Sequence, residues 1–179
     1  IVQSGFINYA NPLEKIEFSM YAGTLERNDF HLSDSSNIIN NSNVKVEKAK
    51  KLQGNKGIYL IYDLGSEQTG LLDIVLTATA GTIINIGHGE HLDDNRVRAH
   101  IGGRNFIDRY ITKEGKQHWV QNFRRIGCRF IQLNIPEIFG NIEIERVTLR
   151  PVYYPFDQVD IPNSNIDAYK DIWDISVQT

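Results

Sequence analysis

The chain has 179 residues, of which 41% are hydrophobic and 23% are charged, and its formal net charge is −3. This length predicts one domain, or one domain with a short appendage, and the apolar fraction is sufficient for a hydrophobic core, which excludes extensive disorder. No run of about 18 apolar residues is present, and the charge is near neutral, so we expect neither a membrane nor a nucleic acid as a partner.

The composition favours strands over helices. The chain contains 24 isoleucines and only 7 alanines, and β-branched side chains fit a pleated, half-buried surface. The single cysteine, Cys128, excludes an internal disulfide and a cysteine-rich zinc site. The N-terminus carries no signal-peptide pattern and no initiator Met, so we expect a processed or excised part of a longer protein. The compartment stays open, with a periplasmic or extracellular location slightly favoured.

The first third of the chain gives the weakest signal. Residues 16–20 alternate like a short strand, and residues 33–43 form a polar Ser/Asn/Asp cluster that predicts a loop. The triplet 40–42 fits a glycosylation sequon, and the basic run 45–51 predicts a solvated strand or loop face. These patterns leave open whether residues 1–56 belong to the same fold as the rest.

From residue 57 onward, apolar residues recur at every second position, with turn signals about every ten residues. Strands are predicted at 57–64, 72–78, 84–90, 106–111, 119–123, 129–135 and 141–152, with a turn beginning at 63–65. In the last strand the apolar positions change from even to odd, which predicts a β-bulge near Glu145–Arg146. Short strands with this spacing are typical of an antiparallel β-sandwich or barrel.

The C-terminal stretch has a different period. Apolar residues follow at helical spacing after the cap candidates 163–165, and they are Ile166, Tyr169, Ile172, Trp173 and Val177. Residues 151–179 carry five Asp against one Lys. This change in composition predicts a β-sandwich domain over 1–155, followed over 156–179 by a linker and the first helix of a helical domain that lies outside the chain.

The densest polar cluster is His88-Gly89-Glu90-His91. On a strand His88 and Glu90 share a face, which is a weak pattern for a metal, and a polar strand end is the stronger interpretation. We therefore expect no metal site and no cofactor. Glu90 and Arg129 both follow the inward-facing pattern of their strands, which predicts that they meet as a partly buried, structural ion pair.

A basic stretch covers residues 96–129, with nine Lys or Arg against two acidic residues. It is compatible with a surface for an anionic ligand or polysaccharide, but outward-facing strand arginines or contacts to an acidic neighbouring domain are the simpler interpretation. The chain contains no nucleophile elbow and no Gly-rich phosphate loop, and no pair of carboxylates is singled out by its spacing. We predict no catalytic residue.

Several short motifs resemble one family. They are Ile61-Tyr62-Asp63-Leu64-Gly65, Thr69-Gly70, Ala80-Gly81-Thr82, Gly89-Glu90-His91-Leu92, Asp108-Arg109-Tyr110, Gly127-Cys128-Arg129-Phe130 and the tail 172–179. In order and spacing they are similar to the concanavalin-like β-sandwich domain of bacterial α-L-rhamnosidases, over about residues 57–179. Cys128 stands where an aromatic residue is common, and 118–120 lacks the usual nearby Pro.

The resemblance implies an inverting glycoside hydrolase whose catalytic carboxylates lie in a downstream helical barrel, so no family catalytic residue transfers to this chain. It implies an all-β, jelly-roll-like sandwich with a short C-terminal helix, which packs against that barrel as its partner. The alternative is a carbohydrate-binding module for rhamnose-containing glycans. Its stacking and hydrogen-bonding candidates are Trp119, Tyr110, His88 and Arg98. A third alternative is a module that recognises a protein partner through an exposed apolar patch.

Overall fold

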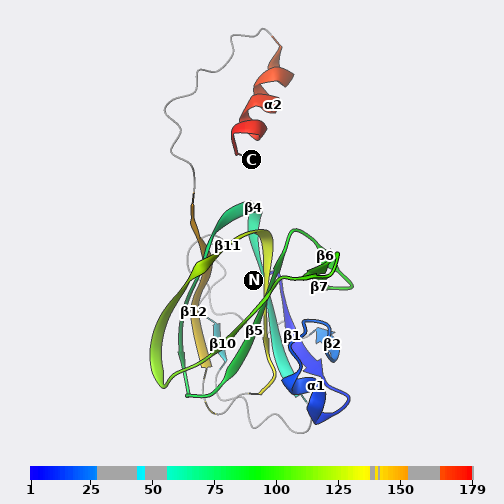
Figure 1. Ribbon diagram of the computed structural model, residues 1–179, viewed down its shortest axis with the longest axis vertical. Helices are drawn as coiled ribbons and strands as arrows, with labels where there is room; N and C mark the ends of the chain where they lie inside the picture. Colours follow the sequence, from blue (N-terminus) through cyan, green and yellow to red (C-terminus); the bar gives the residue numbers. More distant parts are fainter. Residues whose placement is uncertain (28–43, 47–55, 138–139, 141, 153–165, 179) are drawn as a thin grey trace.

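The computed structural model describes residues 1–27, 44–46, 56–137, 140, 142–152 and 166–178, and it is an antiparallel β-sandwich with a C-terminal helix (Figure 1). Its strands are β1 (Gln3–Asn8), β2 (Thr24–Arg27), β3 (Val44–Val46), β4 (Lys56–Ala78), β5 (Ile83–Gly89), β6 (Leu92–Asp93), β7 (Arg96–Val97), β8 (His100–Ile101), β9 (Arg104–Asn105), β10 (Ile107–Ile111), β11 (Gly115–Ile135) and β12 (Ile142–Pro151). Its helices are α1 (Pro12–Ile16) and α2 (Asp167–Gln178).

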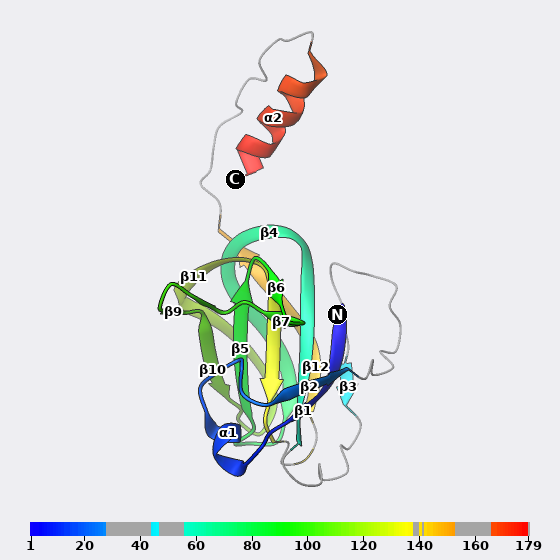
Figure 2. The same ribbon diagram turned by 90° about the vertical axis from the view of Figure 1, so that its right-hand side faces the viewer.

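Two long strands build both layers of the sandwich. The N-terminal part of β4 and the C-terminal part of β11 lie in a first layer with the order β10-β5-β11-β4-β1-β2. The other parts of the same two strands pair again in a second layer, where β12 adds to the free side of β4 and β3 adds to β12. Each long strand therefore bends from one layer to the other, as the curved ribbon of β4 shows (Figure 2).

The core lies between the layers, because alternate side chains of the long strands point inward. On β4 the inward set is Ile58, Leu60, Tyr62, Leu72, Ile74, Leu76 and Ala78, all buried. Strands β5, β11 and β12 contribute Ile84, Ile86, Ile131, Leu133, Ile135, Ile142, Ile144, Val147 and Leu149. These are the positions that the period-2 pattern predicts. The β-bulge predicted near Glu145–Arg146 is confirmed by the register shift between Ile144 and Arg146.

The predicted turn at residues 63–65 is wrong. Strand β4 continues from Lys56 to Ala78 and bends instead, with Gly65 at φ +86° and its N–H donating to Asp63 Oδ1 at 2.8 Å. A Gly with positive φ marks a bend as readily as a chain reversal, so the local signal does not distinguish them. Between the predicted strands 72–78 and 84–90 the chain does turn, at residues 80–81, with Gly81 at φ +86°.

The N-terminal segment belongs to the first layer. Strand β1 pairs antiparallel with β4, and β2 pairs with β1. A second apolar cluster on the outer face of this layer contains Ile7, Tyr9, Tyr59, Ile61 and Val97. The strand expected at residues 16–20 is absent, because α1 occupies 12–16 with Asn11 as its N-cap and bends follow it. The predicted loop 33–43, the sequon and most of the basic run 45–51 lie outside the described residues.

The predicted C-terminal helix is confirmed as α2. Its side chains Tyr169, Ile172 and Ile175 are exposed, with Ile172 at 59% and Ile175 at 65%, whereas Trp173 is partly buried. The cap candidates 163–165 lie outside the described part of the chain. None of the described helices has the length and apolar character needed to cross a membrane.

Candidate functional site

The bend of β11 presents one fully exposed aromatic ring. The pairing of β11 with β4 is interrupted between Val120 and Arg125, and the intervening residues carry the strand from the second layer to the first. Phe123 lies in this interruption with 99% of its surface exposed. Burial of a Phe side chain stabilises a protein by roughly 1.5–3 kcal/mol, so an aromatic ring left wholly in solvent is a candidate contact for a partner.

The backbone beneath Phe123 is held by its neighbour Arg124. The Arg124 guanidinium donates to the carbonyls of Ile107 at 3.5 Å and Asn105 at 3.2 Å, and it lies 3.3 Å from Asp108 Oδ1. It also lies 6.0 Å from the centre of the Phe106 ring. These contacts tie the bend to β10 and to the hairpin β8–β9. Phe123 is therefore displayed by an anchored segment.

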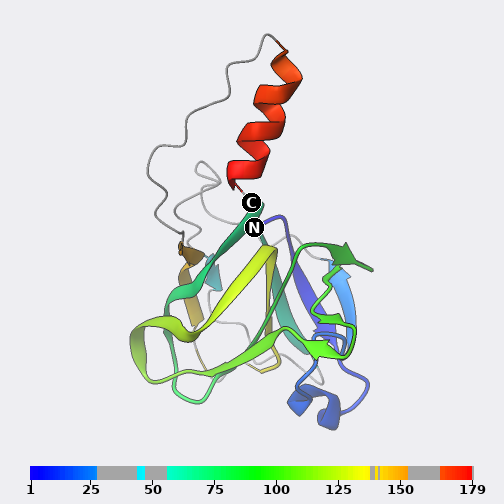
Figure 3. The ribbon, with the colours of Figure 1, turned by 45° about the horizontal axis from the view of Figure 1, so that its top comes forward.

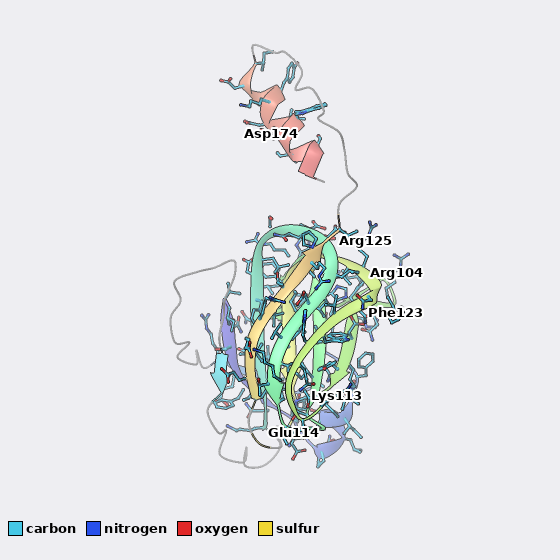
Figure 4. The ribbon with its side chains drawn as sticks, turned by 90° about the vertical axis from the view of Figure 1, so that its left-hand side faces the viewer. Arg104, Lys113, Glu114, Phe123, Arg125 and Asp174 are labelled. Carbon is cyan, nitrogen blue, oxygen red and sulfur yellow. The ribbon has the colours of Figure 1, made fainter. Side chains whose placement is uncertain are left out.

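The basic stretch 96–129 divides into anchored and exposed cations. Five of its nine cationic side chains bind groups within the chain: Arg96, Arg109, Lys116, Arg124 and Arg129. Within the described residues, Arg98, Arg104, Lys113 and Arg125 are exposed and form no ion pair. Figure 4 shows Arg104 and Arg125 on the same side of the sandwich as Phe123, and both lie between Phe123 and the end of the sandwich that is nearer α2. Two of the four exposed cations, Arg104 and Arg125, thus lie on the same side of the sandwich as the exposed ring.

A second charged cluster lies on the outer face of the second layer. Asp73 is almost fully buried and accepts hydrogen bonds from Arg146 at 2.8 Å and Arg150 at 3.1 Å, while His118 Nε2 lies 3.1 Å from its Oδ1. Burial opposes ionisation of Asp73, but the two arginines outweigh it and hold its pKa below the usual value. Nothing in the period-2 pattern distinguishes Asp73 from a solvated strand residue.

The predicted ion pair between Glu90 and Arg129 is wrong. Arg129 binds Asp63 instead, with Nε–Oδ1 at 2.9 Å and Nη2–Oδ2 at 3.0 Å. Strand β5 ends at Gly89, so Glu90 is exposed and lies 3.9 Å from His91. A register shift between Cys128 and Phe130 removes Arg129 from the inward set that continues at Ile131. Both errors arise because a strand end and a bulge change the face on which the next residue lies.

His88 is on the inward face, as its pattern predicts, and is only 3% exposed. Its ring lies edge-on to Phe106, and burial together with the nearby Arg124 lowers its pKa to about 4. Cys128 is also buried in the core, and burial raises the pKa of its thiol to about 12, which keeps it protonated. Neither side chain is accessible to a polymeric substrate.

The four sugar-binding candidates do not form one surface. Trp119 and Tyr110 stack with their ring centres 4.9 Å apart, but both are partly buried against the core, and the Tyr110 hydroxyl donates to Gln117 at 2.8 Å. Arg98 is exposed, whereas His88 is buried. Among the residues that the structure describes, no group of three His, Cys, Asp or Glu side chains is arranged to hold a metal ion.

This geometry defines an antiparallel β-sandwich domain that exposes an aromatic ring and basic side chains. The family profile of the bacterial alpha-L-rhamnosidase concanavalin-like domain matches residues 53–151, more than half of the chain. The chain therefore belongs to this family. No curated protein matches the chain.

Three solved structures are similar to parts of the chain. The GH78 family rhamnosidase of Bacillus sp. GL1 is 27% identical with a TM-score of 0.53, and the match covers 64% of this chain and 11% of that one. The alpha-L-rhamnosidase from Dictyoglumus thermophilum is 25% identical, with a TM-score of 0.39 over 51% of this chain and 11% of its own. The rhamnosidase from Klebsiella oxytoca with rhamnose bound is 14% identical, with a TM-score of 0.39. That match covers 56% of this chain and 22% of the Klebsiella chain. The chain thus spans about a tenth to a fifth of the length of these proteins.

Proposed function

We propose that this chain is a non-catalytic domain of an α-L-rhamnosidase-like glycoside hydrolase and that it supports a helical catalytic barrel by packing against it. Membership of the concanavalin-like domain family supports the parent class. The small share of the rhamnosidase from Bacillus sp. GL1 that the chain covers, 11%, is compatible with an accessory domain.

The observation that carries the packing role is Phe123, a wholly exposed ring on an anchored bend. Aromatic and Arg side chains are enriched at the centres of protein interfaces, and a rigid display keeps the entropic cost of docking small. We propose that Phe123, Arg104 and Arg125 form the surface that faces the barrel. An acidic barrel surface is the matching partner, because the exposed charge beside Phe123 is positive.

The test uses the full-length protein that carries this sequence and compares it with the 179-residue chain. Hydrogen exchange at the amides of residues 121–125 should be slower in the full-length protein than in the isolated chain. Phe123→Ser should lower the Tm of the full-length protein and leave the Tm of the isolated chain unchanged. Lys113→Ser, at another exposed position, is the control. Equal exchange rates in the two proteins would exclude this surface as the interface.

A second measurement tests the non-catalytic assignment. The isolated chain should release no p-nitrophenol from p-nitrophenyl α-L-rhamnopyranoside, while the full-length protein should do so. Turnover by the isolated chain would place catalytic groups within residues 1–179 and contradict the proposal.

The alternative function, a carbohydrate-binding module built on Trp119, Tyr110, His88 and Arg98, has weaker support. An exposed ring face is what stacks on a sugar, and the Trp119 ring is covered on one side by Tyr110. Saturable binding of a rhamnose-containing oligosaccharide that Trp119→Ala abolishes without unfolding would favour this alternative.

A further inference from the structure

A polar cleft of about 530 Å³ lies on the outer face of the first layer, between β2, the hairpin β6–β7 and the outward side chains of β1 and β4. Its size is within the usual range for small-molecule sites. Figure 3 shows the hairpin (green) beside β2 (light blue), which come from distant parts of the sequence. These lining residues lie within the described ranges 1–27 and 56–137.

The floor of the cleft is a buried hydrogen-bonded pair. Tyr59 is completely buried, and its hydroxyl accepts a hydrogen bond from Gln3 Nε2 at 2.8 Å. In the strand register Arg27, Gly5 and Tyr59 lie in one row across β2, β1 and β4. Because Gly5 has no side chain, no β1 side chain separates Arg27 from Tyr59 at this level. The cleft therefore has a fixed polar floor with a cation at its end.

One wall is the tip of the hairpin β6–β7. Asp94 and Asn95 have φ of +48° and +61°, the left-handed pair that a two-residue hairpin turn of type I′ requires. This turn directs Asp93, Asp94 and Asn95 to the cleft, where all three line it. The hairpin is fixed from below, since the N–H of Val97 donates to the buried Gln132 at 2.9 Å. The backbone of this wall is thus preorganised.

The opposite wall is formed by Tyr21, which precedes β2, and by Thr24, the first residue of β2. Arg96 joins the two walls, because its guanidinium donates to the carbonyls of Met20 at 2.8 Å and Ala22 at 3.3 Å and also to that of Gly23. A guanidinium bound to three carbonyls supports the cleft and has little capacity left for an anion. Tyr21 stays 42% exposed, so part of its ring is open to a ligand.

The lining favours an uncharged, hydroxyl-rich ligand. Two aspartates balance two arginines, so the cleft attracts neither an anion nor a cation strongly. Carboxylate and amide oxygens accept hydrogen bonds from sugar hydroxyls, and an exposed tyrosine ring packs against the C–H face of a pyranose. An exposed ring beside such acceptors therefore matches a saccharide, which offers both an apolar C–H face and several hydroxyl donors.

We propose that this cleft binds a neutral pyranose, either as a free monosaccharide or as the terminal residue of a neutral oligosaccharide. Tyr21 stacks on the sugar ring, Asp93 and Asp94 accept from its hydroxyls, and Asn95 supplies an amide at the rim. This site lies apart from the Phe123 surface and does not depend on the proposed packing role. It is also distinct from the partly buried Trp119–Tyr110 pair.

The test is a titration of the ¹⁵N-labelled 179-residue chain, followed by amide chemical shifts. The probes are the methyl glycosides of L-rhamnose, D-galactose and D-glucose, with methyl galacturonoside as the anionic counterpart, at up to about 50 mM, well above the ~1 mM dissociation constant of a weak site. At least one neutral glycoside should give saturable shifts centred on residues 93–96 and 21–25. The galacturonoside should bind at least tenfold more weakly than that neutral glycoside.

The variants separate this cleft from other sites. Tyr21→Ala and Asp93→Asn should each weaken binding at least tenfold, while the matched exposed controls Tyr169→Ala and Asp174→Asn on α2 should leave it unchanged. Trp119→Ala should also leave it unchanged. Unaltered amide spectra outside the cleft show that each variant folds. Absence of saturable shifts with all three neutral glycosides, equal binding by Tyr21→Ala and Asp93→Asn, or preference for the galacturonoside would overturn the proposal.

Discussion

Asp63 and Arg129 join the bends of the two strands that build both layers. Asp63 lies where β4 begins to bend, Arg129 lies at the second register shift of β11, and two nearly parallel hydrogen bonds of 2.9 and 3.0 Å connect them. Paired hydrogen bonds from Arg to a carboxylate combine geometric specificity with charge assistance. This contact therefore fixes the relative position of two irregular segments that backbone pairing leaves undefined.

Replacing Asp63 with Asn should lower the Tm by a few degrees at pH 7. Hydrogen bonds from Arg129 lower the pKa of Asp63, so its contribution to stability is present above the unfolded pKa of about 4 and is lost as the pH falls through the lower folded pKa. The difference in Tm between wild type and variant should therefore shrink below about pH 4. Arg129→Met should lower the Tm with the same pH dependence, whereas the control Arg98→Met should not. A pH-independent difference would contradict this account.

His88 should make the domain sensitive to mild acid. Because burial lowers its pKa to about 4, the unfolded chain takes up a proton at higher pH than the folded chain does, and stability falls as the pH drops from about 6.5 to about 4. The loss should reach about 2–3 kcal/mol. Urea unfolding at pH 7 and pH 4.5 should show a smaller decrease for His88→Leu than for wild type. The exposed His100→Leu should retain the wild-type decrease, and an equal decrease in all three proteins would refute the role of His88.

Gly70 and Gly127 should respond oppositely to the same substitution. A Cβ on Gly70 would collide with the backbone carbonyl of Arg150 on β12, whereas a Cβ on Gly127 would meet Thr69 Oγ1 at an ordinary 3.6 Å. Gly70→Ala should therefore destabilise the domain by about 1–3 kcal/mol, measured by urea denaturation. Gly127→Ala should be neutral or stabilise by up to about 1 kcal/mol, since Ala has less conformational entropy to lose. Equal stability of the two variants would show that β12 moves freely at Gly70.

The Asp73 carboxylate should matter more than an exposed one on the same face. Asp73→Asn leaves Arg146, Arg150 and His118 facing one another without a negative charge, so we expect a loss of about 1–3 kcal/mol. Glu145→Gln, which removes an exposed pair with Lys116, should cost less than about 0.5 kcal/mol. Thermal unfolding at low and high salt measures both. Equal losses for the two variants would mean that the Asp73 cluster is an ordinary surface contact.

The sequence predicts the core of this domain well and its bends poorly. Seven of the eight inward positions predicted on β4 are buried, because a period of two is imposed by the pleat, and Leu64, at the start of the bend, is partly buried. The bend at residues 63–70, in contrast, appears in the sequence only as Gly65 and Gly70 among polar residues. Whether such a segment reverses the chain or carries it into a second sheet depends on distant partners, here β11 and β12.

The functional residues illustrate the same limit. Phe123 is predicted as part of a strand, and only the break in pairing after Val120 reveals that its ring faces solvent. The cleft combines residues near positions 3, 21, 59 and 93, which no local pattern connects. The run Asp93-Asp94-Asn95 is the one local signal for this site, because its last two residues favour a left-handed hairpin turn.

The shared strands also set an order for folding. Along the β4–β11 ladder, Ala78 pairs with Gly115, whereas Ile58 pairs with Ile135, so the chain loop to be closed is about twice as long at the first-layer end. Loop-closure entropy then favours nucleation at the second-layer end, with pairing advancing around both bends. Substitutions at Leu76 should slow refolding, while substitutions at Leu60 should mainly accelerate unfolding, as φ-value analysis would measure. In a domain assembled in this way, the first-layer part of the β4–β11 ladder closes last.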